Sequence, residues 1–291
     1  MIPFVRDFDF EYGRCDQVSP LIRRVMANNP GPFTFTGTAT FIVGHGQVAV
    51  IDPGPALSDH FDALKRALEG ERVTHVLITH THADHAPLGR PLAEATGAEL
   101  LAMRGAGAGA ASVHTLDEPD LGAFEPDRWI EDGEKVSGPG WKLKAVATPG
   151  HASNHVAFAL EEENALFSGD HVMGWSTTVV APPDGDMRAY IDSLKRVMAE
   201  GYGTLWPTHG PPVRNVGPFL QACLDHRLMR ERQLLDALAH GPAGIEAMVP
   251  KLYAETDPKL WPAAGLSMRA HLIKLMEEGR VFCREGLYEI A

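Results

Sequence analysis

The chain of 291 residues carries a formal net charge of −12 and is 44% hydrophobic, enough for one large domain or two smaller ones. It has no run of about 18 apolar residues, and its N-terminus, MIPFVRDFDFEYG, has no apolar signal core, so neither a membrane span nor a secretion signal is expected. An acidic surface repels phosphate backbones at long range, which counts against bulk nucleic-acid binding but leaves room for one strand at a metal centre.

The cysteines Cys15, Cys223 and Cys283 are odd in number and far apart, and none belongs to a CxxC pair. This spacing indicates neither a disulfide framework nor a thiolate zinc site. Reduced thiols fit a cytoplasmic location, which is the location we expect.

The first two hundred residues alternate between strand and helix patterns. In the segment 58–70, Ser58 is a candidate N-cap, Leu64 and Leu68 lie on one helical face, and Gly70 ends the pattern. The other helices are expected at 87–97 and 186–201. Strands, some with the loop that follows them, are expected at 34–44, 47–55, 72–79, 98–103, 141–151, 155–160, 165–170 and 203–210.

Two segments lack a strand or helix pattern. The stretch RGAGAGAAS, residues 104–112, has no bulky side chains, so it is expected to be either a flexible loop or a mobile flap near the substrate. The acidic segment 117–132 is also expected to be a loop.

The texture of the sequence changes after residue 212. Helices are expected at 218–241, 244–256 and 267–279, followed by two short strands around Gly286, which is a winged-helix-like order. We therefore expect a catalytic domain at 1–212 and a winged-helix-like domain at 213–291. The second domain has 10 basic and 10 acidic residues, so its net charge is zero.

The first of these helices carries both leucines and arginines at helical spacing. Four leucines at helical spacing are expected to form a core stripe, and three arginines are expected to lie on a solvated or inter-domain face. The leucines are Leu224, Leu228, Leu235 and Leu238, and the arginines are Arg227, Arg230 and Arg232.

Histidine and aspartate residues gather at the ends of four expected strands. The motif ITHTHADH follows one strand, TPGH another, FSGD a third and PTHG a fourth. Loops at the end of a sheet converge, so these side chains are expected to meet in one site. The seven residues are His80, His82, Asp84, His85, His151, Asp170 and His209.

Neutral imidazoles and carboxylates are ligands for divalent first-row metals. His80 and His82 are two positions apart, so an extended loop can aim both at one ion, while Asp84 and His85 turn towards another. Asp170 is the natural carboxylate between the two ions. Such a pair makes a bridging hydroxide available at neutral pH, because coordination lowers the pKa of water towards about 7.

The motif set THTHADH, TPGH, SGD and PTHG resembles the metallo-β-lactamase fold superfamily over residues 33–212. This resemblance implies an α/β fold, a four-layer αβ/βα sandwich with metals at one edge. By position, Asp52 in IDPGP would support the metal loop from behind, and Asp170 would be shared by both metals. The first metal would take His80, His82 and His151, and the second would take Asp84, His85 and His209.

The C-terminal segment resembles the winged-helix tail of the β-lactamase-like protein 2 branch. Two positions depart from that branch, because Ala39 stands where an asparagine is common and His171 where a cysteine is common. The departure at Ala39 puts any substrate contact through that asparagine in doubt. His155 is a candidate to orient His151, to contact substrate or only to close its hairpin.

The expected activity is that of a dinuclear hydrolase in which a metal-bridging hydroxide attacks an ester, thioester, lactone or phosphodiester. Asp84 is expected to be catalytic, binding metal and holding or relaying the proton. Two Zn²⁺ ions are expected, with Fe²⁺ or Mn²⁺ as alternatives, and a small-molecule substrate is preferred. The alternatives are a single-stranded RNA endonuclease of the same fold and an iron-dependent persulfide dioxygenase-like enzyme. The sequence leaves the oligomeric state open.

Overall fold

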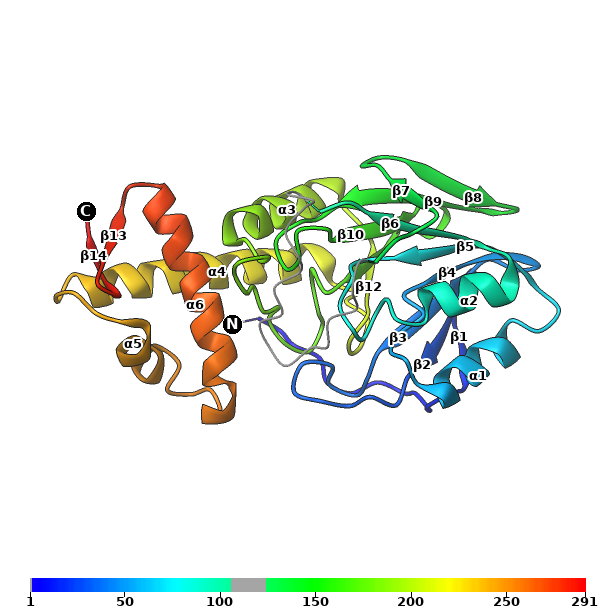
Figure 1. The fold of residues 1–291 in the computed structure, drawn as a ribbon, viewed down its shortest axis with the longest axis horizontal. Coiled ribbons are helices and arrows are strands. Elements are labelled where there is room, and N and C mark those ends of the chain that lie inside the picture. The colour runs from blue at the N-terminus through cyan, green and yellow to red at the C-terminus, as the bar shows by residue number, and fades with distance from the viewer. Residues whose placement is uncertain (1, 106–123) are drawn as a thin grey trace.

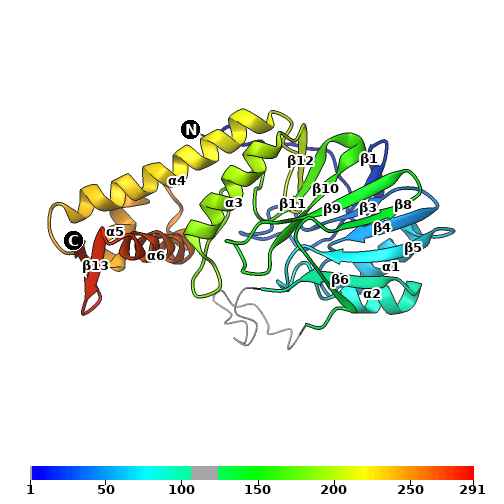
Figure 2. The same ribbon diagram turned by 90° about the horizontal axis from the view of Figure 1, so that it is seen from above.

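Two β-sheets pack face to face, and helices cover the outer face of each sheet (Figures 1 and 2). The computed structural model describes residues 2–105 and 124–291. The seven-stranded sheet runs in the order β1 (Cys15–Ser19), β2 (Ile22–Met26), β3 (Ala39–Val43), β4 (Gln47–Ile51), β5 (Arg72–Ile78), β6 (Glu99–Met103) and β7 (Arg128–Ile130). The five-stranded sheet runs in the order β12 (Thr204–Pro207), β11 (Ala165–Gly169), β10 (Val156–Leu160), β9 (Trp141–Ala147) and β8 (Lys135–Gly138).

The side chains of each central strand point alternately into the core between the sheets and into a core beneath the outer helices. In β3, Phe41 enters the core between the sheets, where its ring centroid lies 5.1 Å from that of Phe167, while Ile42 faces the helices outside. Because both faces of the central strands are buried, these strands are nearly continuous apolar runs. The result is the predicted α/β class with four layers, helix–sheet–sheet–helix.

The outer layers are helices from different parts of the chain. α1 (Ser58–Ala67) and α2 (Gly89–Thr96) cover the seven-stranded sheet. α3 (Met187–Glu200) and the first half of α4 (Val216–Leu238) cover the other sheet. Figure 2 shows these two pairs on opposite sides of the sheets.

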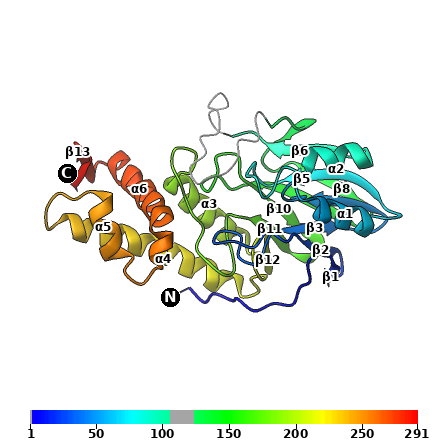
Figure 3. The ribbon, with the colours of Figure 1, turned by 60° about the horizontal axis from the view of Figure 1, so that its bottom comes forward.

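The C-terminal module, which we define as α4 with all that follows it, lies at the end of the sandwich away from α1 and α2 (Figures 1 and 3). Its own core joins Leu234 and Leu238 of α4 with Met268 and Leu272. It comprises α4, α5 (Ile245–Leu252), α6 (Trp261–Glu277) and the antiparallel hairpin of β13 (Val281–Arg284) and β14 (Leu287–Ile290).

Several boundaries differ from those expected. The strand expected at 34–44 begins only at Ala39, because Gly37 takes a φ of +123°, which breaks the extended chain. Strands β1, β2 and β8 were not predicted, since their polar and charged residues hide the pattern. The segment 117–132, expected to be a loop, contains strand β7. Residues 117–123 of this segment lie outside the described residues, and so do residues 106–112 of the expected flexible segment 104–112. Helix α6 begins at Trp261, six positions before the expected start.

One prediction about α4 was partly wrong, and another is decided by the structure. Leu238 is buried, but Leu228 is 38% exposed, so the four leucines do not form one core stripe. For Arg227 the structure selects the second of the two expected alternatives, because this side chain is only 4% exposed and its guanidinium contacts Thr178 and Tyr190. Among the helices of the described ranges, none is both long and apolar enough to cross a membrane.

Candidate metal centre

All seven expected donor residues meet at one edge of the sandwich. His80, His82, Asp84 and His85 follow β5 of the seven-stranded sheet, and the others follow β9, β11 and β12 of the five-stranded sheet. The apolar strands hold the loops rigidly, so the loops bring side chains far apart in sequence together. The donor atoms form groups whose members lie within 4.8 Å of one another.

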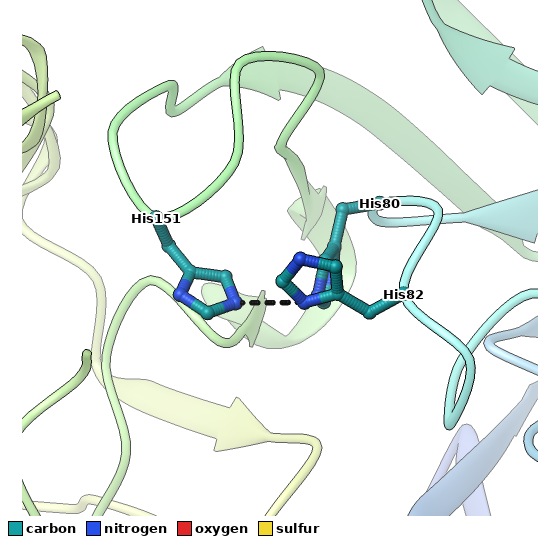
Figure 4. Close-up of side chains that lie close together, drawn as sticks. All are labelled: His80, His82 and His151. Carbon is teal, nitrogen blue, oxygen red and sulfur yellow. Dashed lines mark hydrogen bonds between the residues drawn. The ribbon is translucent and has the colours of Figure 1, made fainter. Parts of the chain in front are cut away.

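The first group contains three imidazoles, His80, His82 and His151. His80 Nε2 lies 2.9 Å from His82 Nδ1, and His82 Nδ1 lies 3.1 Å from His151 Nε2. Figure 4 shows the three rings from the loops after β5 and β9 converging on one point. Three nitrogens facing one another in this way are suited to hold a cation rather than each other.

The second group contains Asp84, His85 and His209. Asp84 Oδ2 lies 3.0 Å from His209 Nε2 and 3.4 Å from His85 Nε2. His85 and His209 are buried, while the side chain of Asp84 is 20% exposed, so this carboxylate is the member of the group that reaches solvent.

Asp170 lies between the two groups. Its Oδ2 is 3.7 Å from His151 Nε2, while its Oδ1 is 3.4 Å from His209 Nε2 and 3.7 Å from His85 Nε2. One oxygen therefore faces each group, which is the arrangement expected of a shared carboxylate.

Asp52 supports the loop from behind the donors, as the sequence predicted. Its Oδ1 accepts from the Thr79 backbone N–H at 2.8 Å. Its Oδ2 accepts from the Thr79 hydroxyl at 2.7 Å, from His85 Nδ1 at 2.9 Å and from the Thr208 hydroxyl at 3.2 Å. This carboxylate ties the loop after β5 to the loop after β12.

Backbone carbonyls orient two further histidines. His151 Nδ1 donates to Val179 O at 2.7 Å, and His209 Nδ1 donates to Gly37 O at 3.1 Å. A carbonyl only accepts, so the proton sits on Nδ1 and the Nε2 lone pair of each ring faces the centre. This fixes the tautomer, as is usual for metal-binding histidines.

The electrostatics divide the donors into two kinds. Burial lowers the pKa values of His80, His82 and His151, so these rings are neutral. Burial also lowers the pKa of His209, but Asp170 and Asp84 outweigh it and raise that pKa to about 10. The second group therefore demands positive charge beside its carboxylates, which a divalent cation supplies when it displaces protons.

The donor set fits a metal ion on three counts. Its nitrogen and oxygen atoms are those that Zn²⁺ takes at about 2.0–2.2 Å, a bond length that separates neighbouring donors by about 3.3 Å. The donor pairs described above, from His80 and His82 at 2.9 Å to His85 and Asp170 at 3.7 Å, have spacings around this value. Among the described residues, the buried atoms His85 Nε2 and Asp170 Oδ1 also have no hydrogen-bond partner, which is costly without a cation.

The lesser candidates have different fates. His155 is fully buried, and its Nε2 accepts from the Asp170 backbone N–H at 3.1 Å while its Nδ1 lies 2.7 Å from the Thr148 hydroxyl. It therefore positions Asp170 rather than His151. His171 is buried, belongs to none of the donor groups found among the described residues, and its ring centroid lies 5.1 Å from that of Tyr190.

Sequence reasoning missed some supports of the site. Ala39 is buried between the sheets, whereas Asn29 accepts from the Thr38 backbone N–H at 2.9 Å, and the Thr38 hydroxyl lies 3.5 Å from Asp84 Oδ2. The Val179 carbonyl was also missed, because a backbone acceptor leaves no mark in a sequence. For Asn29, the one signal in the sequence was its position directly before Pro30 and Gly31, where a turn is expected.

Two packed sheets with outer helices, and histidines and aspartates gathered at one edge, define a protein of the metal-dependent hydrolase class. The family model of the Metallo-beta-lactamase superfamily matches residues 33–209, and that of the Beta-lactamase associated winged helix domain matches residues 245–286. The chain belongs to the metallo-beta-lactamase superfamily, as its motifs indicated, and it is a hydrolase of that superfamily.

Similar proteins extend over most of the chain. The Beta-lactamase-like protein 2 homolog of Caenorhabditis elegans is 29% identical over 91% of this chain and 88% of its own length. Atrochrysone carboxyl ACP thioesterase AgnL7 of Paecilomyces divaricatus is 35% identical over 77% of this chain and 66% of its own length. The crystal structure of a Beta-lactamase domain protein from Burkholderia ambifaria is 25% identical, with a TM-score of 0.83, and the match covers 100% of this chain and 97% of that one.

Proposed function

We propose that this hydrolase is a dinuclear metalloenzyme that cleaves acyl thioesters of modest size. One observation carries the proposal: Asp170 turns one carboxylate oxygen towards His151 and the other towards His85 and His209. A carboxylate shared in this way suits two ions held side by side.

In this proposal the first ion takes His80, His82 and His151, the second takes Asp84, His85 and His209, and Asp170 serves both. Zn²⁺ suits these nitrogen and oxygen donors best, while Fe²⁺ and Mn²⁺ accept the same atoms. The ions supply Lewis-acid chemistry, lowering the pKa of water and polarising the scissile carbonyl.

The chain's own residues hold and move the proton. Hydrolysis adds the oxygen of water to the acyl carbon and breaks the carbon–sulfur bond, and the thiol leaves with a proton. Burial would raise the pKa of Asp84, but His85 and His209 outweigh it and keep the carboxylate ionised. Asp84 is also partly exposed, so it can accept a hydrogen bond from the attacking water and pass the proton towards the leaving sulfur.

The preference for thioesters comes from the relatives. The protein from Paecilomyces divaricatus, 35% identical to this chain, is named an ACP thioesterase, and it shares the match over 77% of the chain. A developing thiolate is also a good leaving group, so a site with little acid to protonate it is sufficient.

The preference for a small substrate comes from charge. Residues 213–291 have equal numbers of basic and acidic side chains, so they do not attract a long polyanion by electrostatics. The C-terminal module contacts the segment 178–180 beside the site, which suits a wall of the substrate cleft. Single-stranded RNA is the competing substrate, and persulfide oxidation by iron is the competing reaction.

A substrate panel tests the proposal. Metal-loaded protein and the Asp84→Asn variant are compared on acyl-coenzyme A, short S-acyl cysteamines, esters, lactones, a chromogenic phosphodiester, labelled single-stranded RNA and glutathione persulfide. We expect thiol release from the thioesters, with at least tenfold higher kcat/KM than for any other class, and its loss in Asp84→Asn. Faster metal-dependent cutting of RNA, or oxygen uptake with the persulfide, would contradict the thioesterase proposal.

A further inference from the structure

The segment Thr178–Val180 contacts two of the donor residues, His151 and Asp170. The Val179 carbonyl accepts the Nδ1 proton of His151 at 2.7 Å. The Thr178 hydroxyl donates to the backbone carbonyl of Asp170 at 2.8 Å and lies 3.1 Å from that of His171. The position of this segment therefore sets the direction of the His151 ring and the path of the chain at Asp170.

The other side of the same segment is held by the C-terminal module. Arg227 Nη2 of α4 donates to the Thr178 carbonyl at 2.6 Å. The Val180 backbone N–H donates to the hydroxyl of Ser267, on α6, at 3.2 Å. Both module residues are buried, Arg227 to 4% exposure and Ser267 to 8%, so water does not compete for these bonds.

The burial of Arg227 is costly unless it serves the segment. Its guanidinium donates to a backbone carbonyl and lies 4.7 Å from the ring centroid of Tyr190. The Tyr190 hydroxyl donates to the His171 carbonyl at 3.0 Å, so the pair of Arg227 and Tyr190 contacts the chain both at Thr178 and next to Asp170. A hydrogen bond from a buried charged group to a backbone carbonyl is strong, so this bond fixes the position of the Thr178 carbonyl.

We propose that Arg227 and Ser267 are positioning residues of the metal centre, acting through Thr178–Val180 on His151 and Asp170. The C-terminal module then sets the geometry around His151 and Asp170. The inference rests on the proposed function only in requiring that the donors bind metal, and it is independent of the substrate.

Metal binding without substrate tests it. The full chain is freed of metal, and its Zn²⁺ affinity is measured by competition with a chromophoric chelator. The visible absorption of the Co²⁺-loaded protein reports the ligand geometry directly. Arg227→Met and Ser267→Ala remove the two contacts, and Ser267→Thr restores a hydroxyl.

The module itself offers matched controls. Arg230 lies on the same helix, donates to the Leu252 carbonyl at 2.7 Å and stacks 4.2 Å from the Tyr253 ring centroid, so Arg230→Met removes similar bonds that do not reach the site. Met268→Ala, beside Ser267, empties part of the module's own core. Thermal unfolding of each variant shows how far the module is destabilised.

We expect Arg227→Met and Ser267→Ala to weaken Zn²⁺ binding about tenfold or more and to change the Co²⁺ spectrum, as loss of a residue behind a ligand usually does. Ser267→Thr, Arg230→Met and Met268→Ala should keep the wild-type affinity and spectrum. Unchanged affinity and spectrum in Ser267→Ala would overturn the inference, and so would equal losses in the two controls. If the wild-type protein binds no metal, both the proposed function and this inference are overturned. If the wild-type protein binds metal and Arg227→Met and Ser267→Ala bind it equally well, only this inference is overturned.

Discussion

Asp52 and His85 share a fully buried hydrogen bond, with 2.9 Å between Asp52 Oδ2 and His85 Nδ1. Besides accepting this proton, the same carboxylate accepts from Thr79 and Thr208. A carboxylate is needed at position 52 because all of these neighbouring groups donate hydrogen bonds. In an asparagine, the amide NH₂ would point at one of these donors and could not accept its hydrogen bond.

Replacing that carboxylate is the first prediction. Asp52→Asn should lower metal affinity about 10- to 100-fold, because the His85 ring loses the partner that fixes its tautomer. Asp132→Asn is a control for loss of a loop carboxylate, since Asp132 accepts from the Ala147 backbone N–H at 2.8 Å and pairs with Arg196 at 2.9 Å. Chelator competition measures both variants, and equal affinities would show that Asp52 only holds the loop together.

The second prediction concerns Asp84. Asp84→Asn should reduce kcat/KM at least about 100-fold, the usual range for losing a proton-handling group, while the melting temperature changes little. Steady-state kinetics and thermal unfolding at verified metal content check it. Wild-type turnover in a fully loaded Asp84→Asn protein would contradict the role.

Metal content is the third prediction. Protein purified without added metal and then saturated should hold about two ions per chain, since the two oxygens of Asp170 face His151 on one side and His85 and His209 on the other. Elemental analysis after gel filtration gives the count and the identity. A single fully occupied ion would remove the dinuclear proposal, and iron in place of zinc would favour the oxidative alternative.

The fourth prediction uses two glycines with positive φ. A Cβ at Gly169, φ +51°, would lie 2.5 Å from His155 Nε2, whereas a Cβ at Gly201, φ +72°, meets nothing within 4 Å. Gly201→Ala should cost only backbone strain, about 1 kcal/mol. Gly169→Ala should cost more and should also weaken metal binding, because it pushes His155 away from the Asp170 backbone. Denaturant unfolding and chelator competition separate the two effects, and metal binding unchanged in Gly169→Ala would exclude the role given to His155.

The fifth prediction is a pH dependence. Burial alone would raise the pKa of Glu231, but hydrogen bonds with His271 and Lys274 outweigh it and hold that pKa below its ordinary 4.5. Such a depressed pKa adds stability that is present above pH 4.5 and is lost as pH falls through the lower folded value. Glu231→Gln should therefore lower the free energy of unfolding by about 2 kcal/mol at pH 7. The difference in unfolding free energy between this variant and the wild type should become smaller below pH 4.5. Urea unfolding at pH 7 and pH 3.5 measures it, and a gap that does not depend on pH would contradict it.

The donors were predictable because each follows an apolar strand directly, so sequence position alone places it at the sheet edge. Their supports were less accessible. Asp52 was found through its motif, but the Val179 and Gly37 carbonyls are backbone groups that any residue supplies. Arg227 was expected on a solvated or inter-domain face, but its partner, the Thr178 carbonyl, is a backbone group that the sequence does not identify.

Helix α4 shows why the predicted stripe of four buried leucines was partly wrong. A single apolar stripe is typical of a helix with one partner. The first half of α4 packs against α3 through Val216 and Phe219, and its second half packs inside the C-terminal module through Leu234 and Leu238. The buried side therefore shifts along the helix, which leaves Leu228 exposed between the two cores. The domain boundary expected at residue 213 stays a prediction.

The continuity of α4 through two cores also bears on how the chain folds and evolves. A helix of 23 residues cannot fray in its middle without exposing apolar side chains on both sides, so the two cores gain or lose order together. The chain is therefore expected to unfold as one cooperative unit, and no cut within α4 yields two independent folding units. Transfer of the C-terminal module to another protein would therefore preserve function only if all of helix α4 were transferred with it.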